Sequence, residues 1–101
     1  MSLKRVVVTG LGALTPIGNT VKEYWGGLIN GVSGAAPITY FDCSEFKTKF
    51  ACELKGFDPE KFMDRKLCRQ MDRFAQYGIV SSDEALSDSG LNITNNNRDR
   101  I

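Results

Sequence analysis

The most informative absence in this sequence is histidine, which occurs at none of its 101 positions. Without an imidazole there can be no Ser-His-Asp or Cys-His nucleophile pair, no histidine general base and no histidine-ligated zinc. Acid–base chemistry within these residues would therefore depend on carboxylates, lysines or tyrosines. The length itself corresponds to about one small domain, since domains commonly have about 100–150 residues.

A strong net charge and long apolar runs are also missing. Thirteen basic residues against twelve acidic ones leave a net charge of +1, so no overall field favours nucleic acid or a membrane surface. The apolar run behind the basic N-terminus, Val6 to Val8, is too short for a secretory signal, and no segment approaches the roughly 18 apolar residues of a membrane span. We expect a cytoplasmic protein that binds neither nucleic acid nor membranes.

Cysteine is scarce, and its pattern excludes two kinds of site. Cys43, Cys52 and Cys68 are odd in number and include no CxxC pair, so they form neither a disulfide framework nor a metal knuckle. Only Cys68, beside Lys66 and Arg69, has basic neighbours that could lower its thiol pKa. No base accompanies it, and we therefore predict no catalytic cysteine and no metal in these residues.

The first half of the sequence predicts one strand, a long turn, a helix and a second strand. Residues 3–9, with three consecutive valines, are typical of a strand covered on both faces in a parallel sheet. Asn19 or Thr20 begins a helix, Thr20 and Glu23 fit a capping box, and Gly31 or Gly34 ends it. Its apolar face comprises Val21, Tyr24, Trp25, Leu28, Ile29 and Val32. Residues 35–42 are irregular, and residues 48–54 form a strand.

The second half is predicted to be mainly helical. Asp58 and Pro59 indicate a helix start, and a long helix is expected from about Arg69 to Ser87, closed by Ser89 and Gly90. Its predicted buried face comprises Met71, Phe74, Ala75, Gly78, Ser82, Ala85 and Leu86. One strong strand, one moderate strand and about three helices indicate an α/β fold whose parallel sheet is incomplete. We therefore expect residues 1–101 to be the N-terminal portion of a larger protein.

Gly10 and Gly12 follow the valine strand and resemble the start of a dinucleotide fingerprint. The third glycine is replaced by Thr15, and no acidic residue stands near Val32, where a ribose ligand would be expected. A tight turn between strand and helix is therefore favoured, with nucleotide binding as the alternative.

A basic segment is the second candidate site. Arg65, Arg69 and Arg73 are four residues apart and would share one face of a helix, with Lys66 beside them. Such a face can bind an acidic partner or phosphates. The alternative is an ordinary solvated helix face, partly neutralised by Asp64 and Asp72.

Several segments of the sequence resemble the bacterial β-ketoacyl-acyl-carrier-protein synthases, in particular the type II elongating enzymes. The segments are RVVVTGLG at 5–12, TPIGNT at 15–20, RK at 65–66, MDRFAQY at 71–77 and DSGL at 88–91. They occur in order along essentially the whole chain. A ketosynthase of a polyketide pathway is the alternative within the same family.

This resemblance implies a thiolase-like fold, with layers ordered α-β-α-β-α, in a homodimer that needs no metal or redox cofactor. It implies a decarboxylative Claisen condensation between acyl- and malonyl-loaded acyl carrier protein. The family's nucleophilic cysteine and two histidines are expected downstream of Ile101, so the 101 residues alone are predicted to be inactive. Arg65, Lys66 and Arg69 match part of the family's carrier-protein-binding patch, although Gln70 stands where the family can carry a lysine. A non-catalytic fragment that docks a carrier protein is the remaining alternative.

Overall fold

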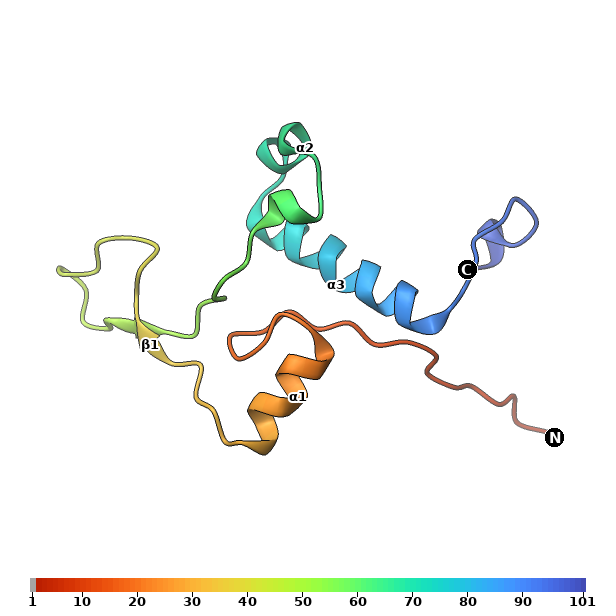
Figure 1. Ribbon diagram of the computed structural model, residues 1–101, viewed down its shortest axis with the longest axis horizontal. Helices are drawn as coiled ribbons and strands as arrows, with labels where there is room; N and C mark the ends of the chain where they lie inside the picture. Colours follow the sequence, from red (N-terminus) through yellow and green to blue (C-terminus); the bar gives the residue numbers. More distant parts are fainter. Residues whose placement is uncertain (1) are drawn as a thin grey trace.

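The computed structural model describes residues 2–101 and consists mainly of three α-helices with a very small sheet (Figure 1). The helices are α1 (Val21–Ile29), α2 (Arg65–Gln70) and α3 (Arg73–Ser89). Strands β1 (Ala36–Pro37) and β2 (Phe50–Ala51) form the sheet, and 3-10 turns occupy η1 (Pro59–Lys61) and η2 (Arg98–Arg100). Helix α3 lies along the centre of the molecule, and the N-terminal segment passes between α3 and α1 (Figure 1).

Both ends of α1 follow local rules. Thr20 Oγ1 accepts a hydrogen bond from the Glu23 backbone N–H at 3.1 Å, which confirms the predicted cap, and the Glu23 carboxylate accepts one from the Asn19 N–H at 2.9 Å. At the other end, Gly31 has a φ of 65° and donates to the Leu28 carbonyl, while the following residue donates to the carbonyl of Gly27. This is a Schellman motif, which requires the left-handed conformation that glycine adopts most readily.

The predicted apolar face of α1 is largely uncovered. Trp25 is 62% exposed, and Leu28, Ile29 and Val32 are exposed as well. An apolar helix face is expected to pack in a core, and for Trp25 this expectation is wrong among the described residues. Spacing indicated which residues share a face, but burial requires a second element to pack there, and none covers it within residues 2–101.

The predicted long helix is present but begins later and buries another face. The chain is extended at Met71, with φ −121° and ψ 142°, so residues 69 and 70 belong to α2 and α3 starts at Arg73. Phe74, predicted to be buried, is 75% exposed, whereas Gln76 and Val80 are buried. Helix α3 ends as expected at Gly90, which has a φ of 68°.

The predicted strand over residues 48–54 is confirmed only at Phe50 and Ala51. These residues pair antiparallel with Pro37 and Ala36, within a segment that was predicted to be irregular. The carboxylate of Glu53 helps to hold this hairpin, because it accepts hydrogen bonds from the backbone N–H groups of Thr39 and Tyr40 at 3.0 and 3.1 Å. The sheet of the described residues is thus a short antiparallel ribbon rather than the predicted parallel sheet.

The predicted strand over residues 3–9 is not formed. Val6, Val7 and Val8 are 88, 63 and 79% exposed, and no other described segment pairs with them. A strand exists only through hydrogen bonds to a neighbouring strand, and residues 2–101 offer none at this position.

The described residues do not enclose a core of their own. The radius of gyration is 17.7 Å, against about 13 Å for a compact domain of 100 residues, and Val80 is the only buried apolar side chain among residues 2–101. None of the helices in this range is long and apolar enough to cross a membrane.

Candidate functional site: a basic helix at the start of the α2–α3 pair

Helix α2 carries three of the basic residues singled out from the sequence. Its cap is Asp64, whose Oδ1 accepts a hydrogen bond from the Lys66 backbone N–H at 2.9 Å. Arg65, Lys66 and Arg69 are all exposed on this short helix. The structure therefore brings the three predicted docking residues together on one exposed element.

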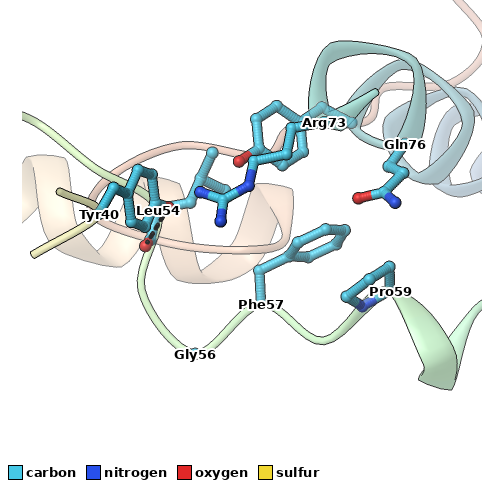
Figure 2. A pocket seen from close by; sticks show the side chains of 8 residues that line it. Tyr40, Leu54, Gly56, Phe57, Pro59, Arg73 and Gln76 are labelled. Carbon is cyan, nitrogen blue, oxygen red and sulfur yellow. Dashed lines mark hydrogen bonds between the residues drawn. The ribbon is translucent and has the colours of Figure 1, made fainter. Parts of the chain in front are cut away.

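Arg73 does not belong to this group. Because the chain is extended at Met71, Arg73 begins a new helix and cannot continue the row formed by Arg65 and Arg69. Its guanidinium carbon lies 4.1 Å from the centre of the Tyr40 ring, in a cation–π contact with the β1–β2 hairpin (Figure 2). The prediction that residues 65, 69 and 73 share one helix face is wrong for this reason.

The charges of α2 are little neutralised by their surroundings. The one ion pair within residues 2–101 joins Arg65 Nε to Glu60 Oε1 at 3.6 Å, and both side chains are more than half exposed. Lys66 and Arg69 have no carboxylate oxygen within 4.0 Å among these residues. In the alternative of an ordinary solvated helix face, Asp64 and Asp72 would partly neutralise these charges. The Asp64 carboxylate instead accepts a hydrogen bond at the N-cap of α2. Two exposed positive charges are thus available to an acidic partner.

Gln76 connects α3 to α2 and was not identified from the sequence. It is only 8% exposed, and its Nε2 donates hydrogen bonds to the backbone carbonyls of Cys68 and Met71 at 3.0 and 3.5 Å. The sequence did contain a signal for this contact, namely a glutamine within the largely apolar run from Phe74 to Val80. If such a residue is buried, its amide requires hydrogen-bond partners.

An open cavity of about 460 Å³ lies between the hairpin and the start of α3 (Figure 2). Phe57 stands at its centre, where its ring packs edge-on against Tyr77 at a centroid distance of 5.3 Å. The side chains of Tyr40 and Arg73 close one side, and Pro59 and Gln76 the other (Figure 2). Desolvation, together with Tyr77, raises the pKa of Tyr40, so this phenol is protonated at neutral pH. The cavity therefore offers the Arg73 cation and the neutral phenol of Tyr40 rather than an acid–base pair.

The glycine-rich turn does not form a phosphate site. The backbone N–H groups of Leu11 and Ala13 donate to the carboxylates of Asp88 and Glu84 at 3.0 and 2.8 Å. A Cβ built on Gly12 would lie 1.8 Å from the Ser81 carbonyl oxygen, so the glycine allows the chain to pack directly on α3. The two backbone N–H groups that a phosphate would need are already bound to carboxylates, and these carboxylates would repel a phosphate. The geometry therefore contradicts the nucleotide-binding alternative.

The cysteines show no sign of activation. All three are free thiols, and Cys52 is exposed. Partial burial raises the pKa of the Cys68 thiol, and the carboxylates of Glu60 and Asp64 raise it further, although the sequence suggested that its basic neighbours could lower it. No cluster of three or more metal-ligating side chains occurs within residues 2–101.

Comparison with known families identifies the chain's relatives. The model of the β-ketoacyl synthase N-terminal domain matches residues 3–101. The chain therefore belongs to the β-ketoacyl synthase family, which confirms the resemblance read from the sequence.

Three of the curated relatives share one name. The chain is 50% identical over 98 residues to 3-oxoacyl-[acyl-carrier-protein] synthase 2 of Synechocystis, and 50% identical over 101 residues to the Vibrio cholerae protein of that name. The Staphylococcus aureus protein of the same name is 49% identical over 98 residues. These alignments cover 97–100% of this chain but 24% of each relative, so the chain spans about a quarter of their length.

A solved structure supports the fold assignment. The ishigamide ketosynthase/chain length factor superimposes with a TM-score of 0.78 at 40% sequence identity, covering 85% of this chain and 21% of that one. The described elements are thus arranged as in part of a ketosynthase.

Proposed function

We propose that this chain is an incomplete N-terminal portion of a β-ketoacyl-acyl-carrier-protein synthase, an acyltransferase of fatty acid elongation. The observation that carries the proposal is 50% identity along the whole chain to proteins named 3-oxoacyl-[acyl-carrier-protein] synthase 2. Residues 1–101 would contribute one part of the first domain of a thiolase-like fold with α-β-α-β-α layers. The open shape of residues 2–101, with a single buried apolar side chain among them, agrees with a segment that packs against further structure.

The proposed reaction joins two thioesters. A cysteine thiolate displaces the carrier protein's thiol from acyl-carrier protein and so takes up the acyl chain. Malonyl-carrier protein then loses carbon dioxide, and the resulting carbanion attacks the acyl-cysteine thioester. The cysteine thiolate leaves, and the product is a 3-oxoacyl-carrier protein lengthened by two carbons. The resemblance assigns this chemistry to one cysteine and two histidines, and no metal or redox cofactor is needed.

These catalytic groups are proposed to lie in another part of the protein. Residues 1–101 contain no histidine, and the raised pKa of Cys68 does not favour a thiolate there. The test is to incubate the protein as its cell produces it with acyl- and malonyl-carrier protein and to follow 3-oxoacyl-carrier protein by mass spectrometry. Absence of condensation by that protein would contradict the proposal, as would acyl transfer to Cys43, Cys52 or Cys68.

A polyketide ketosynthase is the second candidate, and the similarity to the ishigamide ketosynthase/chain length factor favours it. The higher identity to the 3-oxoacyl synthases favours fatty acid elongation. The same assay separates the two. A single condensation that stops at the 3-oxoacyl product supports fatty acid elongation, whereas repeated condensation without reduction supports the polyketide role.

Within the proposed enzyme, helix α2 is proposed to bind the acidic surface of acyl carrier protein through Arg65, Lys66 and Arg69. Support comes from the exposure of all three residues and from the absence of carboxylate partners near Lys66 and Arg69 in the described chain. Each exposed ion pair contributes about 0.2–1 kcal/mol, so the residues would have to act together. A docking fragment without catalytic activity of its own would use the same surface.

Charge reversal tests this surface. The double substitution Lys66→Glu and Arg69→Glu is expected to raise the KM for acyl-carrier protein about two- to thirtyfold, which corresponds to losing two exposed ion pairs. The matched control is Lys47→Glu in the exposed hairpin loop, which changes a charge of the same sign away from α2. An unchanged KM in the double variant would contradict the docking role.

The homodimer and the cytoplasmic location are part of the same proposal. Both are supported by the family resemblance. The mass of the native protein by light scattering tests the first, and cell fractionation tests the second.

A further inference from the structure

Gln76, near the start of α3, is a buried polar side chain next to the basic helix α2. Burying an amide without partners is costly, and the Gln76 Nε2 atom meets this cost by donating to the carbonyls of Cys68 and Met71. Both carbonyls lie at the end of α2, where the chain becomes extended, and the Cys68 carbonyl also accepts a long hydrogen bond of 3.4 Å from the Met71 backbone N–H. One side chain of α3 thus adds hydrogen bonds to the end of the helix that precedes it.

Helix α2 has few other attachments. It has only six residues, which is too short for a stable isolated helix, and all of them except the half-buried Cys68 are exposed. The ion pair of Arg65 with Glu60 joins it to η1, and a weak contact of Cys68 Sγ with the Met63 carbonyl, 3.7 Å away, joins it to the segment between η1 and α2. Gln76 therefore supplies the side-chain hydrogen bonds that join the C-terminal end of α2 to α3 within the described residues.

We infer that Gln76 is a positioning residue that sets the direction of α2, and with it the arrangement of Lys66 and Arg69, for a carrier protein. The inference rests on the proposed docking function of α2. Gln76 is 8% exposed and offers almost no surface to a partner, so it acts through the basic helix. Its loss would change the recognition of the carrier protein and leave the chemical step unchanged.

The experiment is a double-mutant cycle in the protein as its cell produces it. Gln76→Met keeps the length of the side chain but removes both donors, and it is combined with Lys66→Glu and Arg69→Glu. Two substrates are compared, namely acyl-carrier protein and the acyl thioester of N-acetylcysteamine, which carries no protein. Gln76→Met alone is expected to raise the KM for acyl-carrier protein up to about tenfold, and by less than the two charge reversals do, because it acts only through these charges.

Three further results are expected. The kcat with acyl-carrier protein and the kcat/KM with the small thioester stay unchanged. In the charge-reversed background, Gln76→Met adds no further increase in KM, because residues that act as a unit are non-additive. Gln76→Lys, which restores a donor near the two carbonyls, keeps the KM close to that of the natural protein. If Gln76→Met fails to fold, the KM of Gln76→Lys tests the positioning role.

The outcomes separate this inference from the docking proposal. If charge reversal raises the KM but Gln76→Met does not, the docking surface stands and the role of Gln76 is wrong. If charge reversal has no effect, the docking surface fails and the inference fails with it. An equal effect of Gln76→Met in both backgrounds, or with both substrates, would mark a general loss of stability and overturn the positioning role, as would a raised KM in Gln76→Lys.

Discussion

Glu84 and Ala13 lie 71 residues apart in the sequence, yet a carboxylate oxygen of Glu84 accepts a 2.8 Å hydrogen bond from the Ala13 backbone N–H. The same carboxylate accepts from the N–H of Val21, the first residue of α1, at 3.1 Å. An acidic group at a helix N-terminus is also favoured by the helix dipole. One side chain of α3 therefore joins the glycine-rich turn and the start of α1.

Removing the Glu84 carboxylate is expected to destabilise the protein. Glu84→Ala should lower the free energy of unfolding by about 1.5–3 kcal/mol, the range for a hydrogen bond to a charged group. Glu84→Gln, which keeps one acceptor oxygen, should cost less. Urea denaturation of the natural protein measures the change, with Asp83→Ala as the control on the exposed side of α3. Equal midpoints for Glu84→Ala and Asp83→Ala would show that these hydrogen bonds contribute little.

Gly12 is expected to tolerate no side chain. A Cβ at this position would lie 1.8 Å from the Ser81 carbonyl oxygen, so Gly12→Ala must push the turn away from α3. Such overpacking costs about 1–3 kcal/mol, and more where backbone atoms collide. Gly26→Ala is the matched control, because nothing lies within 4 Å of its Cβ and alanine favours a helix by about 1 kcal/mol. Thermal unfolding should show a lower midpoint for the first variant and a higher one for the second, and a reversed order would contradict the close packing.

The β1–β2 hairpin is expected to loosen in acid. Desolvation raises the pKa of Glu53, but hydrogen bonds from Thr39 and Tyr40 and the charge of Lys55 outweigh it, so the pKa is lowered from its ordinary 4.5. A folded-state pKa below the unfolded value gives stability that is present above pH 4.5 and is lost as the pH falls through the lowered pKa.

The amide resonances of Thr39 and Tyr40 should therefore shift together between pH 4.5 and more acidic values in NMR spectra. Glu53→Gln, whose amide does not titrate, should abolish this shift at any pH. A shift that persists in Glu53→Gln would assign the acid sensitivity to another group.

Arg73 and Tyr40 are expected to be energetically coupled. The guanidinium lies 4.1 Å from the ring centre, and an exposed cation–π contact contributes about 0.5–1 kcal/mol. A double-mutant cycle with Arg73→Met and Tyr40→Leu should recover a coupling of this size from unfolding free energies. Tyr40→Phe serves as the control, since it keeps the ring and removes only the hydroxyl that donates to the Leu54 carbonyl. Additive effects of the two substitutions would show that the contact does not attach the hairpin to α3.

Local features of the fold could be predicted well from the sequence. Thr20 caps α1, Asp58 caps η1 through a 3.0 Å hydrogen bond to the Glu60 N–H, and Gly90 ends α3. Each of these depends on residues within a few positions of one another, so residue type and spacing are enough to indicate them. The placement of Arg65, Lys66 and Arg69 on one helix could be predicted for the same reason, because they are close in sequence.

The features that could not be predicted depend on distant segments. Periodicity placed Phe74 on a buried face and residues 3–9 in a covered strand, but both need a partner surface that residues 2–101 do not supply. The extended backbone at Met71 divided a helical pattern that looked continuous, and so it separated Arg73 from the basic helix.

Family membership, the caps at Thr20 and Gly90 and the basic character of α2 could all be predicted from residue order, because motifs, capping hydrogen bonds and local charge depend on neighbouring residues. Only the tertiary structure showed that Gln76 reaches back to the end of α2 and that Glu84 joins α3 to Ala13. The reason is physical: a hydrogen bond across tens of residues depends on how helices lie in space, and the spacing of residue types along the chain does not encode it.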